Sequence, residues 1–223
     1  MIKNIAKLSA ITLMATCAAY STSAFSEGYS HTKKYQVTVT NITKGQSFTP
    51  ILSATHGYKT RFFELGAPAS NELIALAESG NVAPLLETLT ANRSVKDTAT
   101  TAGLLTPGSS VSFEIESMRL ASLSLAAMLI PTNDTFFALD AVSLPRFGSR
   151  TYFAKAYDAG SETNDEYCAN IPGPACGGVG LSEDDSGEGY VYISQGIHGE
   201  ADLTASEYDF RGVVAKITIS RMH

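Results

Sequence analysis

The sequence contains no tryptophan, only four histidines and only three cysteines. It also has no uninterrupted apolar run of the ~20 residues that a helix needs to cross a bilayer. A chain without tryptophan lacks the usual platform for stacking on a sugar ring, which argues against a glycosidase. The histidines, at positions 31, 56, 198 and 223, show no short metal-ligand spacing, so a zinc site is not indicated.

Positive charge is scarce as well. The chain has 16 Lys and Arg residues against 22 Asp and Glu residues, for a formal net charge of -6. This balance argues against nucleic acid or anionic lipid as a partner through bulk electrostatics.

The first 24 residues follow the three-part pattern of a secretory signal peptide. Two lysines precede an apolar run from Leu8 to about Ala19, and small residues then end at Ala24. Cleavage after Ala24 would remove two lysines and no acid, so the net charge of -6 would become -8 and about 199 of the 223 residues would remain. We therefore expect an exported protein of the periplasm, cell surface or medium. A flexible segment at 25–33 would precede one domain at 34–222.

The cysteines agree with export. Cys17 lies within the leader, in a stretch loosely shaped like a lipoprotein cleavage site, but Thr16 stands where Gly or Ala is usual. Cleavage after Ala24 leaves Cys168 and Cys176, an even number in an oxidising compartment, so a disulfide between them is expected. A metal pair would need two further soft ligands, which the sequence does not offer.

Short segments of alternating or continuous apolar residues, separated by Gly/Pro turns, predict an all-β chain. The predicted strands are 33–43, 48–57, 111–117, 121–130, 135–144, 150–157, 189–195 and 212–221. Helical spacing is confined to 67–92, with Ser70 as N-cap and Gly80 as stop, followed by a second short helix at 82–89 that holds Pro84 in its first turn. The pattern predicts an antiparallel sandwich or barrel with a small helical insertion.

The segment "YDAGSETNDEYC" (157–168) crowds acidic and amide side chains at positions 158, 162, 164 and 166. Calcium prefers such oxygen ligands, and loops at one end of a β-sandwich can supply them. A solvated turn capped by Asp and Asn fits the same spacing. An EF-hand is excluded because the twelfth position is Ala169 rather than a bidentate Glu. If the tip of "LIPTNDTFFALD" (129–140) lies beside this loop, Asp134 adds a ligand.

A hydrolase is the alternative from another class. It would use the acidic loop cluster, or His56 with Ser186 of an Asp-Ser-Gly sequence. The Gly expected in an oxyanion loop is missing at Asp184, and two carboxylates within one loop would be poorly held. A structural envelope protein whose acidic loops only provide solubility is a third possibility.

Four segments together resemble the spondin domain as found in exported bacterial proteins. They are "MLIPTNDTFFALDAVSLP" (128–145), "YDAGSETNDE" (157–166), "GYVYISQGIHG" (189–199) and "GVVAKITISR" (212–221). The resemblance runs from about Tyr35 to Arg221. It implies an eight-stranded antiparallel β-sandwich, similar to calcium- and lipid-binding domains, with a calcium ion between two loops at one end. Animal members are adhesion modules of the extracellular matrix.

Site residues are carried over one by one from this resemblance. Asp134 and Asp158 match the two loops, and Glu162 stands where animal members have Asp. Asp140 matches an acidic position on the strand after the tip, and Glu116 falls near an acidic position on the preceding strand.

The resemblance makes the distal residues Asn164, Asp165 and Glu166 turn residues rather than ligands. Thr135 replaces the tryptophan of animal members, and the thrombospondin-type repeats linked to the domain in those members are absent from this sequence, so carry-over of their integrin partners is not supported. The expected function is a calcium-binding interaction or adhesion module without catalytic activity. Its partner would be a protein or glycan of the envelope or matrix.

Overall fold

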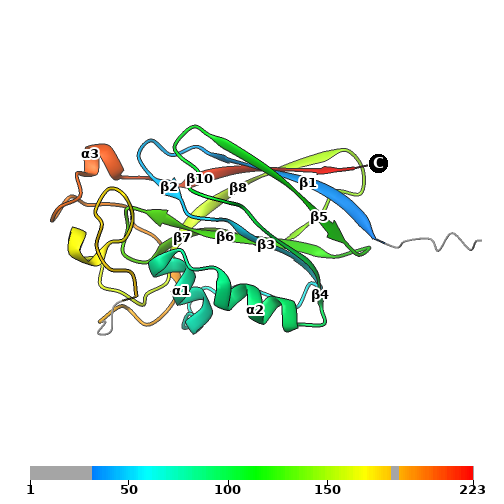
Figure 1. Ribbon diagram of the computed structural model, residues 1–223, viewed down its shortest axis with the longest axis horizontal. Helices are drawn as coiled ribbons and strands as arrows, with labels where there is room; N and C mark the ends of the chain where they lie inside the picture. Colours follow the sequence, from blue (N-terminus) through cyan, green and yellow to red (C-terminus); the bar gives the residue numbers. More distant parts are fainter. Residues whose placement is uncertain (1–31, 182–185, 223) are drawn as a thin grey trace, which may run out of the picture. The chain divides into compact units, whose positions relative to one another are not determined.

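Residues 32–181 and 186–222 are described by the computed structural model in Figure 1. The expected signal peptide at 1–24 and the lipidation alternative at Cys17 lie outside these residues, as does Asp184. Most of the expected flexible segment lies outside them too, and its last residue, Lys33, already belongs to the first strand.

Ten strands within these residues form one antiparallel sheet in the spatial order β4-β3-β6-β7-β8-β10-β1-β5, with the short β2 and β9 paired to β6 and β8. The outermost strands, β4 and β5, contact each other, so the sheet folds over into a nearly closed sandwich (Figure 1). This confirms the predicted antiparallel sandwich. The strands are β1 (Lys33–Asn41), β2 (Ser47–Phe48), β3 (Leu52–His56), β4 (Val95–Thr100), β5 (Ser110–Ser117), β6 (Ser122–Ile130), β7 (Thr135–Ser143), β8 (Ser149–Asp158), β9 (Tyr192–Ile193) and β10 (Val213–Arg221).

The main core lies between the two layers of the sandwich. On β1 the alternating residues Tyr35, Val37 and Val39 are buried, as their period of two predicts. Phe48 and Phe137 meet in this core with ring centroids 4.3 Å apart. Both rings are fully buried, so they contribute strongly to the apolar packing that holds the layers together.

Two helices, α1 (Asn71–Ser79) and α2 (Ala83–Ala91), cover the outer face of one layer (Figure 1). The predicted caps of α1 are confirmed: Ser70 Oγ accepts from Leu73 N–H at 3.3 Å, and Gly80 ends the helix with φ +68°. Leu73 packs in a second apolar cluster with residues of β6 and β7. Because helices cover one face and the core the other, β6 is buried at every position.

The strand predictions were wrong in three places. Val95–Thr100 is an edge strand whose half-buried, polar sequence lacks apolar alternation, so it was not predicted. The segment 48–57 forms two strands rather than one, and only Tyr192–Ile193 of the predicted strand 189–195 is extended. The structure also has a short helix α3 (Ala205–Tyr208) and a 3-10 turn at Cys168–Asn170.

The expected disulfide between Cys168 and Cys176 is confirmed. It lies in the long connection between β8 and β10, where main-chain hydrogen bonds from Gly178 to Ile171 and from Val179 to Ala169 fold the segment back on itself. The disulfide therefore closes a short loop directly after the acidic loop.

Replacing Phe137 by Ala should destabilise the fold by about 3–5 kcal/mol, because it leaves a cavity beside Phe48 that the core cannot fill. Urea unfolding measures this change. Phe153→Ala is the matched control, since that ring is 57% exposed on β8 and its loss should cost about 1 kcal/mol or less. Equal losses for the two variants would contradict the placement of the core.

Candidate metal centre

The turn between β6 and β7 and the loop after β8 meet at one end of the sandwich. Thr135 on β7 lies opposite Asp158 on β8 in the antiparallel register. The N–H of Ala159 donates to the carbonyl of Asp134 at 3.2 Å, which extends the ladder by one residue. Asp134 and Asp158 are therefore brought side by side where their strands end.

The Asp134 side chain organises the loop that follows β8. It is 0% exposed, and its Oδ2 accepts from the N–H groups of Ser161 at 2.8 Å and Glu162 at 3.1 Å. The Ser161 hydroxyl donates to the same oxygen at 3.3 Å. The other oxygen, Oδ1, is buried and has no hydrogen-bond donor within the described part of the chain while Asp158 is ionised; a protonated Asp158 can donate to the Asp134 carboxylate. A buried carboxylate oxygen without a hydrogen-bond donor destabilises the folded state unless a proton or a cation compensates its charge.

Asp158 is 1% exposed and is held by its own loop. Its Oδ1 accepts from Gly160 N–H at 2.9 Å, and its Oδ2 accepts from Asn164 Nδ2 at 2.9 Å. Asn164 Nδ2 also donates to Tyr192 Oη at 3.0 Å. Gly160 has φ +65°, and a Cβ there would lie 2.3 Å from the carbonyl oxygen of Tyr190, so only glycine fits this turn.

The two carboxyl groups interact directly and perturb each other. Burial, followed by the negative charge of Asp134, raises the pKa of Asp158 to about 8. Burial also raises the pKa of Asp134, against the opposing effect of the hydrogen bonds from Glu162 and Ser161. The pKa of Tyr192 is raised by burial and then by the Asp158 charge. At neutral pH the pair therefore retains a proton, unless a cation replaces it.

Glu162 is the third predicted site residue that the structure brings to this end. Its N–H bonds Asp134, and its side chain is buried. Asn164 was expected to be only a turn residue, yet it bonds Asp158 directly. Tyr192 was not predicted at all, because its place beside Asp158 follows only from the pairing of β9 with β8.

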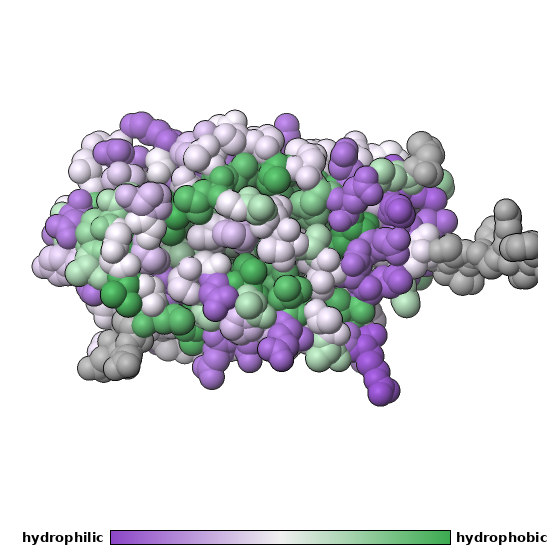
Figure 2. Space-filling view, in the orientation of Figure 1, coloured by the Kyte–Doolittle hydropathy of each residue, from purple (hydrophilic) through white to green (hydrophobic). Residues whose placement is uncertain are grey.

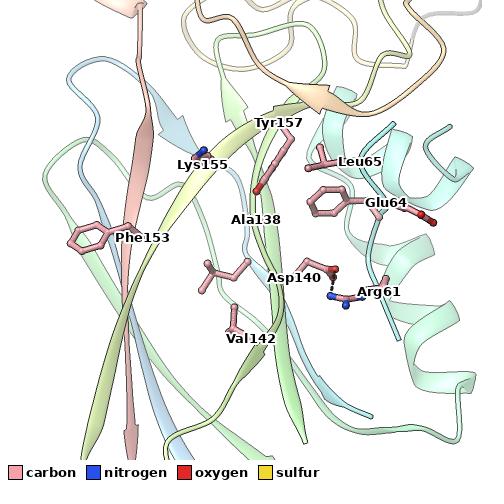
Figure 3. A pocket seen from close by; sticks show the side chains of 11 residues that line it. Arg61, Glu64, Leu65, Ala138, Asp140, Val142, Phe153, Lys155 and Tyr157 are labelled. Atoms are coloured by element: carbon pink, nitrogen blue, oxygen red, sulfur yellow. Dashed lines mark hydrogen bonds and ion pairs between the residues drawn. The ribbon is translucent and has the colours of Figure 1, made fainter. Parts of the chain in front are cut away.

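The structure does not bring Asp140 to the centre. This residue lies six positions beyond Asp134 on β7, about 20 Å along the strand. There its carboxylate forms an ion pair with Arg61 at 3.0 Å and accepts from Phe62 N–H at 2.9 Å and Ser124 Oγ at 3.1 Å. Figure 3 shows the Arg61–Asp140 pair in the wall of a groove of about 630 Å³ on the outer face of β7 and β8. Asp140, the acidic residue on this strand, therefore forms a structural ion pair with Arg61.

Glu116 also lies away from the centre. It is near the end of β5, opposite Lys34 of β1, and its carboxylate is 3.9 Å from Lys96 Nζ. This is the other end of the sandwich, since β1 begins there. Glu116 falls only near the acidic position of the family pattern, and the structure does not bring it to Asp134 and Asp158.

Asp165 and Glu166 hold loops together rather than merely forming a turn. The buried Glu166 carboxylate accepts from three successive main-chain N–H groups, those of His198, Gly199 and Glu200. Asp165 Oδ1 accepts from Asn133 Nδ2 at 3.0 Å. These contacts fasten the acidic loop to the 198–200 segment and to the tip before Asp134, which fixes the position of the carboxylate pair.

His56 and Ser186 lie at opposite ends of the sandwich. His56 is buried opposite Ser122, with Nε2 2.8 Å from Ser124 Oγ and Nδ1 2.9 Å from Gly57 O. Ser186 is exposed and precedes Gly187, which packs against the 160–162 turn near Asp134. The length of β6, about 27 Å, separates these ends. The pair therefore cannot form a catalytic dyad.

Among residues 32–181 and 186–222, no group of three or more His, Cys, Asp or Glu side chains is arranged to hold a metal ion by itself. The pair of carboxylates nevertheless has the features that a hard cation would satisfy: two buried like charges and one oxygen without a donor. Calcium accepts amide, main-chain carbonyl and water oxygens beside carboxylates, so two or three acidic ligands are sufficient.

Residues 21–170 match the family model described as Spondin_N. The match ends before β9 and β10, although β10 lies between β8 and β1 in the sheet and so completes the same fold. No protein in the curated set matches the chain. In the described part of the chain, no helix is long and apolar enough to span a membrane.

The carboxylate pair predicts how stability depends on pH when no divalent cation is present. The folded state keeps a proton on Asp158 up to about pH 8, whereas the unfolded chain loses it near the ordinary aspartate pKa of 3.8. The free energy of unfolding should therefore fall by a few kcal/mol in total between about pH 4 and pH 8 and then level off. Urea unfolding in chelator across this range measures it.

Asp134→Asn should flatten this pH dependence. Its Oδ1 can accept the N–H groups of Ser161 and Glu162, while the negative charge beside Asp158 is removed. In chelator at about pH 8 the variant should be more stable than the unmodified chain by roughly 1–2 kcal/mol. An unchanged slope in Asp134→Asn would contradict the coupling of the two groups.

Proposed function

Because the chain belongs to the Spondin_N family, we propose that it is an exported interaction module in which Asp134 and Asp158 hold a calcium ion. Membership of this family makes the chain an extracellular interaction domain, and the Cys168–Cys176 disulfide is consistent with export. Beyond this general role, we propose a bound calcium ion, an adhesive role, and a protein or glycan partner in the envelope or matrix.

One observation supports the calcium site above the others: the buried Asp134 Oδ1 lies beside a second buried carboxylate and has no hydrogen-bond donor among the described residues once Asp158 is ionised. Hydrogen bonds to Oδ2 already fix this side chain, so the open oxygen cannot turn to solvent without breaking them. A divalent cation would neutralise the pair and lower both pKa values. Asp134 and Asp158 would be its carboxylate ligands, and amide, main-chain carbonyl and water oxygens would complete the shell, since no third acidic side chain of residues 32–181 and 186–222 joins the pair.

Calcium would act here as a structural clamp. Asp134 belongs to the tip before β7 and Asp158 to the end of β8, and their hydrogen bonds extend through the loop to Asn164. A calcium ion bound by both carboxylates would join these loops and would replace the proton that otherwise compensates their charges. The clamp would thereby fix the loop surface at this end, where a partner could be recognised.

The buried pair is poorly suited to catalysis, and we propose no reaction for it. Asp134 and Asp158 are almost completely buried, and neither lines the grooves of about 630 and 540 Å³. A general acid or base must reach its substrate within hydrogen-bond distance. Asp140 does line a groove, but its carboxylate is engaged by Arg61.

Thermal melting with excess calcium and then with chelator tests the proposal. At a calcium concentration of about 100 times Kd, binding should add about 2.7 kcal/mol and raise Tm by roughly 5–10 °C. Asp134→Asn and Asp158→Asn should each abolish the rise, since either removes a ligand charge. Magnesium should act more weakly, because it demands a tighter octahedral site.

Glu116→Gln and Asp140→Asn serve as matched controls. Both remove a carboxylate that the family pattern assigned to the site but that the structure places elsewhere. They should retain the full calcium-dependent rise in Tm. Identical melting of the unmodified chain in calcium and in chelator would refute the calcium site.

A further inference from the structure

A second groove, of about 540 Å³, lies at the end of the sandwich opposite the carboxylate pair. Three loops and the ends of two strands line it: the 57–60 and 118–121 loops, the β7–β8 loop at 144–148, the start of β1 and the end of β10. Residues 131–134 and 144–148 lie at opposite ends of β7, so the length of that strand, about 27 Å, separates this groove from Asp134.

Large apolar side chains protrude from the rim of this groove. Phe147 is 83% exposed and Leu120 is 75% exposed, and Tyr58 and Met118 are exposed beside them. They come from three separate loop tips. Single exposed apolar residues are ordinary, but four around one groove form a patch that marks an interaction surface.

Leu120 is also held in an unfavourable backbone conformation. Its φ is +63°, in the left-handed region that a leucine rarely adopts and that a glycine would occupy without strain. The side chain packs into no core in return, because it is largely exposed. Such a residue at a loop tip points to a role outside the fold.

The charge around the groove has one sign. Four of the lining residues, Lys33, Arg119, Arg146 and Arg221, are cations, and no lining residue is acidic. None of the four forms an ion pair within residues 32–181 and 186–222. The Arg221 guanidinium lies 5.6 Å from the Phe147 ring centroid, so charge and apolar surface meet in one place. Figure 2 shows hydrophilic residues gathered at this end of the molecule, where β1 begins.

We propose that this end docks on a membrane surface that carries anionic phospholipid, with the cations contacting lipid phosphates and the apolar tips inserted among the headgroups. Apolar side chains flanked by Lys and Arg are what an interfacial binding site requires. The net charge of -6 describes the chain as a whole and hides this local excess of cations. The negative net charge therefore does not prevent this surface from binding anionic lipid.

A second copy of the chain fits the groove less well. Asp134, Asp158, Glu162 and Glu166 at the other end are almost completely buried, so they cannot pair with these cations in a second copy. Two acidic residues at the groove's own end are engaged as well: Glu116 is paired with Lys96, and Asp97 accepts from Glu116 N–H at 2.7 Å. A lipid surface supplies both the phosphates and the apolar layer that these side chains lack.

Vesicle cosedimentation tests the proposal. The protein is exported from expressing cells, its first residue is read by N-terminal sequencing, and it is mixed with phosphatidylcholine vesicles with and without about one third phosphatidylglycerol. We expect binding only to the anionic vesicles, in chelator as well as in calcium. It should weaken strongly when the salt is raised from about 0.1 M to 0.5 M.

Variants separate charge from apolar insertion. Arg119→Gln with Arg146→Gln should lower vesicle affinity by about 25-fold, at roughly fivefold for each cation. Leu120→Gly should lower it by about fivefold or more while leaving Tm equal or higher, because it relieves the strained φ. Phe147→Ser should also weaken binding. Phe153→Ser with Lys155→Gln is the matched control, since it removes an exposed ring and cation from the other groove, and it should bind normally.

Three outcomes would overturn the proposal. The first is equal binding to neutral and anionic vesicles, or no binding to either. The second is unchanged binding by the Arg119/Arg146 variant. The third is a concentration-dependent dimer, seen by sedimentation velocity without vesicles and lost in that variant, which would assign the surface to a second copy. Each measurement is also made in chelator, where no calcium is bound. A failure of vesicle binding can therefore be distinguished from a failure of the calcium site.

Discussion

Two carboxylates buried side by side constrain the whole loop end of this sandwich. Asp134 and Asp158 do not merely lie near the loop after β8, because the loop is built on their oxygens. The N–H groups of Gly160, Ser161 and Glu162 all donate to one or the other. The same burial that makes these hydrogen bonds strong makes the two charges costly together. A shared proton or a bound cation has to compensate them, and we propose the cation.

The same strands present a different chemistry at their other end. There the side chains are exposed rather than buried, and cationic and apolar rather than acidic. β7 runs from one end to the other, from the tip at Asp134 to the loop that carries Phe147. A clamp at one end and a docking surface at the other are compatible in one rigid sandwich, since neither requires the other to move.

Much of the fold could be predicted from the sequence because its signals are local. The alternation in β1, the continuous burial of β6, the Ser70 cap and the Gly80 stop each depend on a few neighbouring residues. Asp134 and Asp158 were brought together only by resemblance to a family, since strand register is not local. The ion pair of Asp140 could not be predicted for the same reason, because its partner Arg61 lies 79 residues away in the chain. Tyr192 and the N–H groups that bind Glu166 also come from distant segments, so their roles could not be found from spacing.

We propose that a calcium ion replaces the proton shared by Asp134 and Asp158. Isothermal titration of calcium into the protein, in buffers of different ionisation enthalpy, counts both the ions bound and the protons released. We expect one calcium ion per chain. Binding should release close to one proton at a pH below the Asp158 pKa of about 8, and almost none above it. Calcium binding without proton release at the lower pH, or no binding at all, would contradict it.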